Sequence, residues 1–148
     1  MSQIRPVALC LLVHEDRILL QEVYHSGVRY LRPPGGGIDF GEPAVTAVRR
    51  EVREEVGSEI TEPHLVAIWE NREKFILHND QRHEIVFLFR AHLTAEALHE
   101  LDVVPIDDNG IQGVAHWYPI HELVTHPTGV LEPAMLSDLL RQGNWQQS

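Results

Sequence analysis

A glycine-rich segment followed by an acidic helix constrains this chain more than any other stretch of its sequence. Gly35–Gly37 follow two prolines, and such a segment is costly to order because glycine loses the most backbone freedom on folding. Residues 43–57 predict a helix, since Pro43 suits a first helical turn and Gly57 suits a left-handed C-terminal cap. A glycine loop in this position is usual where backbone must approach a ligand closely.

The predicted helix carries an apolar stripe and an acidic face. Valines at positions 45, 48, 52 and 56 recur at the spacing of one helical side. Glu51, Glu54 and Glu55 stand at i, i+3 and i+4, so they project together from a face beside that stripe. An acidic helix alone is typical of a solvated surface. A divalent cation, however, turns repulsion between clustered carboxylates into binding, and the preceding glycine loop favours a metal-bridged phosphate site.

These residues resemble the signature of the Nudix hydrolases, G-x5-E-x7-R-E-U-x-E-E-x-G-U, in which U is apolar. The match runs from Gly36 to Ser58 and places the fixed residues at Gly36, Glu42, Arg50, Glu51, Glu54, Glu55 and Gly57, with Val52 at the first apolar position. Ser58 departs from the pattern, because the family usually has an aliphatic residue there. That position packs rather than reacts, so the departure concerns local packing.

The resemblance implies a fold and a reaction. The implied fold is α/β (α+β), a mixed β-sheet sandwiched between α-helices, and a single domain is expected over residues 1–148. In this family, water attacks a phosphorus of a nucleoside diphosphate that is linked to another group. The implied cofactor is Mg²⁺ or Mn²⁺, and the implied partner is a small-molecule nucleotide-type diphosphate substrate. A homodimer also fits, since dimers are common in the family.

The resemblance further assigns roles to individual residues. Glu54 and Glu55 are expected to bind the metal directly, Glu51 is a ligand or the general base, and the carbonyl of Gly36 is a further ligand. Many members of the family add an acid from outside the signature. Glu84 is the candidate here, with an ordinary strand-end glutamate as the equally weighted alternative and Glu70 as a weaker candidate.

Other residues are expected to orient the loop or to contact the substrate. Arg50 is predicted to pair with Glu42 and hold the loop against the helix, an orienting part of the catalytic set. Arg29 and Arg32 lie just before the glycine loop, where the planar guanidinium suits phosphate contact, although exposed edge charges are an alternative. His83 beside Glu84 is a candidate substrate contact.

The remaining chain predicts strands alternating with short helices and turns. Strands are predicted at residues 7–13, 18–23, 28–31, 64–70, 73–79, 84–93 and 115–118, a turn at 79–81, a loop at 102–113, one or two helical turns at 119–124 and a helix at 133–142, while residues 94–101 are ambiguous. The continuous apolar run at residues 7–13 predicts a strand buried on both faces, which makes Cys10 a buried apolar residue.

Composition excludes several classes of protein. The formal net charge of −10 argues against nucleic-acid binding, which needs a cationic surface. With one cysteine, no disulfide within the chain forms. The longest apolar run is too short to cross a membrane, and no signal peptide precedes it, so a cytoplasmic location is expected.

Two other readings of the chain differ in chemistry. A catalytically inactive nucleotide-binding or regulatory module of the same fold is expected to have lost acids, yet Glu51, Glu54 and Glu55 all remain. A prenyl-diphosphate isomerase would need a cysteine nucleophile near the site, and Cys10 in a predicted buried strand is a poor candidate for that role. The substrate stays open among nucleoside triphosphates, ADP-ribose-like compounds and nucleotide sugars. Phe75, where some dinucleoside-polyphosphate hydrolases carry tyrosine, weakens that further reading.

Overall fold

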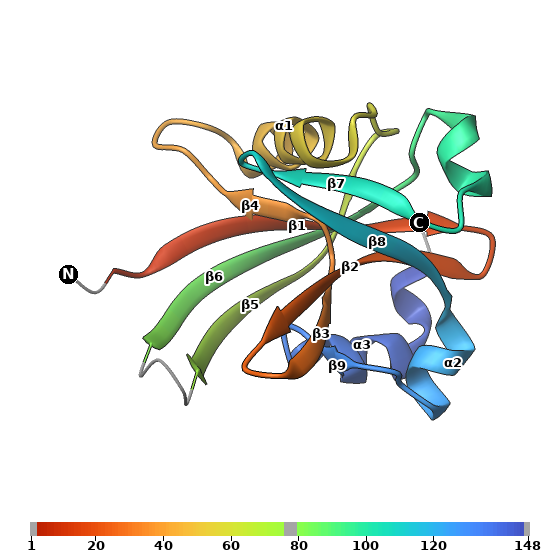
Figure 1. Ribbon diagram of the computed structural model, residues 1–148. Helices are drawn as coiled ribbons and strands as arrows, with labels where there is room; N and C mark the ends of the chain where they lie inside the picture. Colours follow the sequence, from red (N-terminus) through yellow and green to blue (C-terminus); the bar gives the residue numbers. More distant parts are fainter. Residues whose placement is uncertain (1–2, 76–79, 147–148) are drawn as a thin grey trace.

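The computed structural model describes residues 3–75 and 80–146 and shows a mixed β-sheet between helices (Figure 1). Helix α1 lies over one face of the sheet, and α2 and α3 lie over the other, so the predicted fold class is confirmed. The elements are β1 Arg5–His14, β2 Arg17–His25, β3 Val28–Arg32, β4 Gly35–Gly37, α1 Ala44–Val56, β5 His64–Phe75, β6 Asp80–Ala91, η1 Glu96–Glu100, β7 Val104–Asp108, β8 Ile111–Pro119, α2 Ile120–Thr125, β9 Val130–Leu131, α3 Met135–Gln142 and η2 Asn144–Gln146.

Strand β1 is the centre of the sheet. It pairs in parallel with β6 and antiparallel with β2 and β4, within the strand order β5-β6-β1-β2-β3-β9. Its two faces enter two different cores, with Ala8 and Cys10 on the α1 side and Leu9 and Leu11 on the side of α2 and α3. This double burial explains the continuous apolar run and confirms the prediction for this strand. Burial also raises the pKa of the Cys10 thiol, so Cys10 is an inert packing residue.

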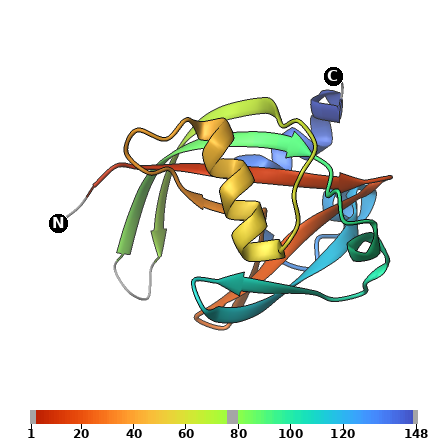
Figure 2. The same ribbon diagram turned by 90° about the horizontal axis from the view of Figure 1, so that it is seen from above.

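Helix α1 packs its valine stripe onto the sheet and ends as predicted. Val48, Val52 and Val56 are buried in the core, whereas Val45 is 37% exposed and lies outside it. Burying each of the three is worth roughly 1.5–3 kcal/mol. Gly57 adopts the left-handed conformation (φ 81°), which confirms the predicted C-terminal cap. Figure 2 shows the helix crossing the sheet over β1 and β4, with β7 beside it.

Ser58, the departure from the family pattern, is buried and hydrogen-bonded. Its hydroxyl donates to the carbonyl of Glu59 at 2.8 Å and accepts from the backbone N–H of Ala95 at 3.2 Å. The serine therefore joins the end of α1 to the segment before η1, a connection that an aliphatic side chain cannot make.

Three predictions of secondary structure were wrong. Residues 64–75 form the single strand β5, so no break separates them into two strands. Asp80 and Gln81 belong to β6 rather than to a turn. Residues 76–79, the rest of the predicted strand at 73–79 and the start of the predicted turn, lie outside the described residues.

The largest error is the predicted loop at residues 102–113, which is the β7–β8 hairpin. Val104 and Ile106 are buried in alternation, and Asn109 and Gly110 turn the chain with positive φ angles of 55° and 88°. Pro105 is tolerated because β7 pairs only with β8, so one side of the strand needs no backbone donor.

The C-terminal part agrees more closely with the sequence. The ambiguous residues 94–101 contain η1, and the predicted helices at 119–124 and 133–142 appear as α2 and α3. Across residues 3–75 and 80–146, every helix is too short or too polar to cross a membrane.

Candidate active site

A polar cavity of about 440 Å³ lies between α1, the glycine strand β4 and the ends of several strands. Its lining consists of Arg5, Arg32, Gly35–Gly37, Asp39, Arg50, Glu51, Glu54, Glu55, Arg82, Asp107, Asp108 and Asn109. The cavity thus brings the predicted glycine loop and acidic helix together with residues from β1, β3, β6 and the β7–β8 hairpin.

The glycines of β4 are required by what packs against them. Gly35 has φ 147°, and a Cβ there would collide with the backbone of Ala8 on β1. A Cβ on Gly36 would lie 2.7 Å from the carboxyl carbon of Glu51. The missing side chains therefore let β4 pair closely with β1 and let the Glu51 carboxylate rest on the backbone of the loop.

Arg50 connects the loop to the helix, and its predicted pairing with Glu42 is confirmed. Its Nε and Nη2 donate to the two carboxylate oxygens of Glu42 at 2.8 and 2.9 Å, a bidentate pair. Nη2 also donates to the carbonyl of Gly37 at 3.1 Å, and Nη1 donates to Glu51 at 3.0 Å. The Arg50 guanidinium and the backbone N–H of Asp39 lower the pKa of Glu42 to about 2. Glu42 is therefore a permanent anchor for Arg50.

Glu55 is the buried acid of the cluster. Its carboxylate accepts a hydrogen bond from the backbone N–H of Gly35 at 3.1 Å. Burial, followed by the negative charges of Glu51 and Asp108, raises the pKa of Glu55 to about 8. Arg32 and the Gly35 N–H oppose this shift. A nearby cation would favour the ionised form, because it offsets both the lost hydration and the repulsion.

The carboxylates suit a hard divalent cation chemically. Oxygen donors are what Mg²⁺ and Mn²⁺ prefer, and Gly36, Glu51, Glu54 and Glu55, which carry such donors, all line the cavity. Within the residues that the structure describes, no three acidic, histidine or cysteine side chains already converge as a metal site. Arg50 instead contacts Glu51 and Glu54 at 3.0 and 3.4 Å.

Several residues proposed from sequence lie outside this lining. Glu84 is buried on β6, where Asn71 Nδ2 donates to its carboxylate at 3.4 Å. His83 pairs with Glu70 at 2.8 Å and lines a separate shallow pocket. Of the two arginines proposed for phosphate contact, the structure places only Arg32 in the cavity.

Arg29 instead joins three elements away from the cavity. It donates to the hydroxyl of Tyr118 at 2.6 Å, to Thr128 at 3.0 Å and to Glu22 at 3.3 Å. These contacts tie β3 to β2, to β8 and to the segment before β9.

Sequence reasoning missed six of the lining residues. Asp39 lies two residues after β4, within the segment that carries the family signature. Asp107, Asp108 and Asn109 reach the cavity because they sit at the turn of the β7–β8 hairpin. Arg5 and Arg82 reach the cavity from the beginnings of strands β1 and β6. The Asn-Gly pair after two aspartates was the available signal, since this dipeptide favours tight hairpins that present their flanking side chains at one end.

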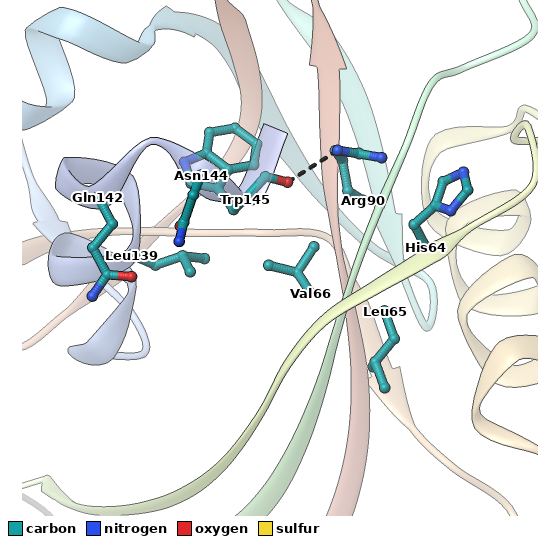
Figure 3. Close-up of a pocket in the computed structure, with 8 residues that line it drawn as sticks. All are labelled: His64, Leu65, Val66, Arg90, Leu139, Gln142, Asn144 and Trp145. Atoms are coloured by element: carbon teal, nitrogen blue, oxygen red, sulfur yellow. Dashed lines mark hydrogen bonds between the residues drawn. The ribbon is translucent and has the colours of Figure 1, made fainter. Parts of the chain in front are cut away.

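A second cavity, of about 290 Å³, shares no lining residue with the first (Figure 3). It is bounded by β5, β6 and the C-terminal end of α3, and Arg90 donates to the carbonyl of Trp145 across it at 3.0 Å. Its eight lining residues include no acid, so this cavity offers no carboxylate to a metal.

Comparison with known protein families identifies the chain. The model of the NUDIX domain matches residues 3–139. The chain belongs to the Nudix family. A search of curated protein sequences gives no significant match. The Nudix assignment therefore stands on the domain model and on structural likeness.

Solved structures share the Nudix fold with this chain. A MutT NUDIX hydrolase from Burkholderia pseudomallei superposes with a TM-score of 0.68 at 22% identity, covering 95% of this chain and 98% of that one. A NUDIX hydrolase from Nitrosomonas europaea gives 0.64 at 19% identity, with coverages of 96% and 90%. A MutT protein from Methanosarcina mazei Go1 gives 0.66 at 16% identity, with coverages of 94% and 91%. At these identities the likeness supports the fold alone.

Proposed function

We propose that this Nudix protein is a metal-dependent hydrolase that cleaves the diphosphate linkage of a nucleoside diphosphate derivative. The observation that carries the proposal is the cavity itself, whose lining contains Glu51, Glu54 and Glu55 together with several arginines. A diphosphate bridged to a cation needs both, because the metal neutralises part of its charge and guanidinium groups neutralise the rest.

The residues divide the chemical work by position. Glu54, Glu55 and the carbonyl of Gly36 are the proposed ligands of Mg²⁺ or Mn²⁺, which when bound supplies charge stabilisation at the phosphoryl oxygens. Glu51 rests against Gly36 and is oriented by Arg50, so it is placed either to complete the ligand set or to accept the proton of the attacking water. Arg50 keeps this arrangement fixed through its bidentate bond to Glu42.

The hairpin offers a different candidate from Glu84 for the additional acid that lies outside the signature. Asp107 and Asp108 line the cavity, and Asp108 lies close enough for its charge to raise the pKa of Glu55. We therefore favour the β7–β8 hairpin over Glu84 as the source of an additional metal-binding carboxylate. A homodimer and a cytoplasmic location stay predictions from the sequence.

The proposal is tested with a panel of nucleoside triphosphates, ADP-ribose-like compounds and nucleotide sugars, incubated with Mg²⁺ or Mn²⁺ and assayed for nucleotide and phosphate products. We expect turnover of at least one compound, abolished by EDTA and restored by excess metal. Tight binding of panel compounds with no turnover under any metal condition would instead support the inactive module.

A further inference from the structure

Two histidine rings from distant parts of the chain are stacked where β1 turns into β2. His14 ends β1, and His99 lies in η1, the short helix between β6 and β7 (Figure 1). Their ring centroids are 4.0 Å apart and the ring planes differ by 9°, so the imidazoles lie face to face. Trp117 on β8 meets both rings at steep angles, with centroid distances of 6.1 Å to His14 and 5.6 Å to His99. One aromatic cluster thus joins β1, η1 and β8.

The ring of His99 is buried without polar partners. Its side chain is 5% exposed, and within the described part of the chain neither ring nitrogen makes a hydrogen bond. The carboxylate of Glu96 lies 3.3 Å from Nδ1 but outside hydrogen-bonding geometry, and it is 88% exposed. Aromatic stacking therefore holds this ring in place. A charged imidazole is unfavourable at such a position, because a buried charge needs hydrogen-bonded partners.

The stacked ring lies beside two hydrogen bonds that hold η1 against the sheet. The indole N–H of Trp117 donates to the carbonyl of Leu98 at 3.0 Å, and Arg17 Nη2 donates to the carbonyl of His99 at 3.3 Å. Leu98 also closes the turn of η1, since its N–H donates to the carbonyl of Ala95 at 3.1 Å. Because the two accepting carbonyls belong to His99 and to its neighbour, displacement of the His99 ring disturbs both bonds.

The charged groups around the stack have both signs. Arg17 from β2 brings a positive charge to η1. Glu15, in the turn after β1, lies 3.7 Å from His14 Nε2 and is 74% exposed, and Glu96 is the exposed acid on η1. His92 after β6 is a third imidazole near this end of β1, where its Nδ1 donates to a β1 carbonyl at 2.8 Å. Water screens both acids, whereas the stacked rings contact each other directly.

We propose that the stack of His14 on His99 is an acid-sensitive latch, which holds η1 in place near neutral pH and releases it when both imidazoles are protonated. Histidine ordinarily takes up a proton at about pH 6.5. In the stack, the second proton places two like charges 4.0 Å apart, one of them on a ring without an acceptor. After release, water solvates both cations. Acid therefore favours the released form, which binds more protons than the latched form. Neither ring lines the cavity beside α1, so the latch does not depend on the proposed function.

The test follows the hydrogen bonds of η1 through a pH titration of the intact protein. Nuclear magnetic resonance gives the exchange protection of the Trp117 indole N–H and of the Leu98 amide, each corrected for the intrinsic pH dependence of exchange. The buried indole N–H of Trp145 is the internal reference. We expect protection at Trp117 and Leu98 to fall at least about tenfold between about pH 7.5 and 5, with the reference unchanged, because like charges at this separation repel by more than the thermal energy.

Variants of His14 separate charge from stacking. His14→Phe keeps an aromatic ring but removes one charge, and the position is 25% exposed, so the larger ring has room at the surface. Protection in this variant should change less than about twofold over the same range, because the repulsion is gone. His14→Gln is a second uncharged variant, which serves if phenylalanine does not fit.

His121→Phe is the matched control, because His121 is an exposed histidine on α2, and this variant should keep the full acid response. Two results would overturn the latch. One is an equal loss of protection in the unaltered protein and in the uncharged His14 variants. The other is an unaltered protein whose η1 hydrogen bonds stay equally protected throughout the titration.

Discussion

Arg50 donates two parallel hydrogen bonds to Glu42, from Nε to Oε2 at 2.8 Å and from Nη2 to Oε1 at 2.9 Å. The pair joins a helix residue to the segment that follows the glycine strand. Because the same guanidinium also contacts the Gly37 carbonyl and Glu51, it sets the distance between loop and acids. Any loosening of this pair moves the groups proposed to bind the metal.

Arg50→Lys should therefore lower kcat about 10- to 100-fold, the usual cost of losing a group that orients metal ligands. Lysine keeps the charge but lacks the planar fork that binds both oxygens of Glu42. Steady-state kinetics with the best substrate of the panel measure the effect. Arg53→Lys is the control, because Arg53 is 54% exposed on the same helix and pairs only at 3.4 Å with Glu59. Equal activity of the two variants would contradict the orienting role.

Glu54→Gln should lower kcat at least 100-fold and leave the melting temperature of the metal-free protein nearly unchanged. The side chain is 55% exposed, so its amide replaces a charge without disturbing packing, while the ligand set loses an anion. Glu59→Gln is the matched control and should keep its activity, since Glu59 is 57% exposed and also lies 3.4 Å from an arginine. Retention of more than half of the activity by Glu54→Gln would count against its role as a ligand.

The acidic cluster of Glu51, Glu54 and Glu55 was predictable from the sequence, because all three residues lie within one helix. Helix α1 and its left-handed cap follow from the chemistry of residues close in the chain. The glycine segment was predicted as a loop, whereas it forms β4, because its backbone pairs with the distant strand β1. Arg5 and Arg82, which line the cavity from β1 and β6, were not predictable in the same way. Arg82 and Glu132 meet across 50 residues, a contact that depends on how β6 and β9 are placed in the sheet.

The β7–β8 hairpin shows a different kind of failure. The polar run before Gly113 looked like a loop because Pro105 and the acids mask the alternation of Val104 and Ile106. Edge strands tolerate such residues, since one side of their backbone faces no partner strand. As a result, Asp107 and Asp108 were left out of the predicted site although the turn places them in the cavity.

Gly36→Ala should reduce kcat strongly, because its methyl group would lie 2.7 Å from the carboxyl carbon of Glu51 and push that side chain away from the loop. Circular dichroism and kinetics together separate this local effect from unfolding. Gly113→Ala is the control. A Cβ at this position would lie 3.9 Å from its nearest neighbours, which are side-chain atoms of Gln21 and Ile106. Normal kcat in Gly36→Ala would show that the position of Glu51 is not critical.

The stability of the metal-free protein should fall as pH rises towards 8. Glu55 has its pKa raised from 4.5 to about 8 by burial and by the charges of Glu51 and Asp108, so the folded state binds a proton that the unfolded state releases near pH 4.5. The contribution of protonated Glu55 to the free energy of unfolding is therefore complete below pH 4.5 and is lost as pH rises through about 8. Mg²⁺ replaces that proton, so its stabilising effect on the melting temperature should grow over the same range. Melting curves from pH 5 to 9, with EDTA or with Mg²⁺, measure both trends. Glu55→Gln should flatten the metal-free curve, and an unchanged slope in this variant would assign the pH dependence to another group.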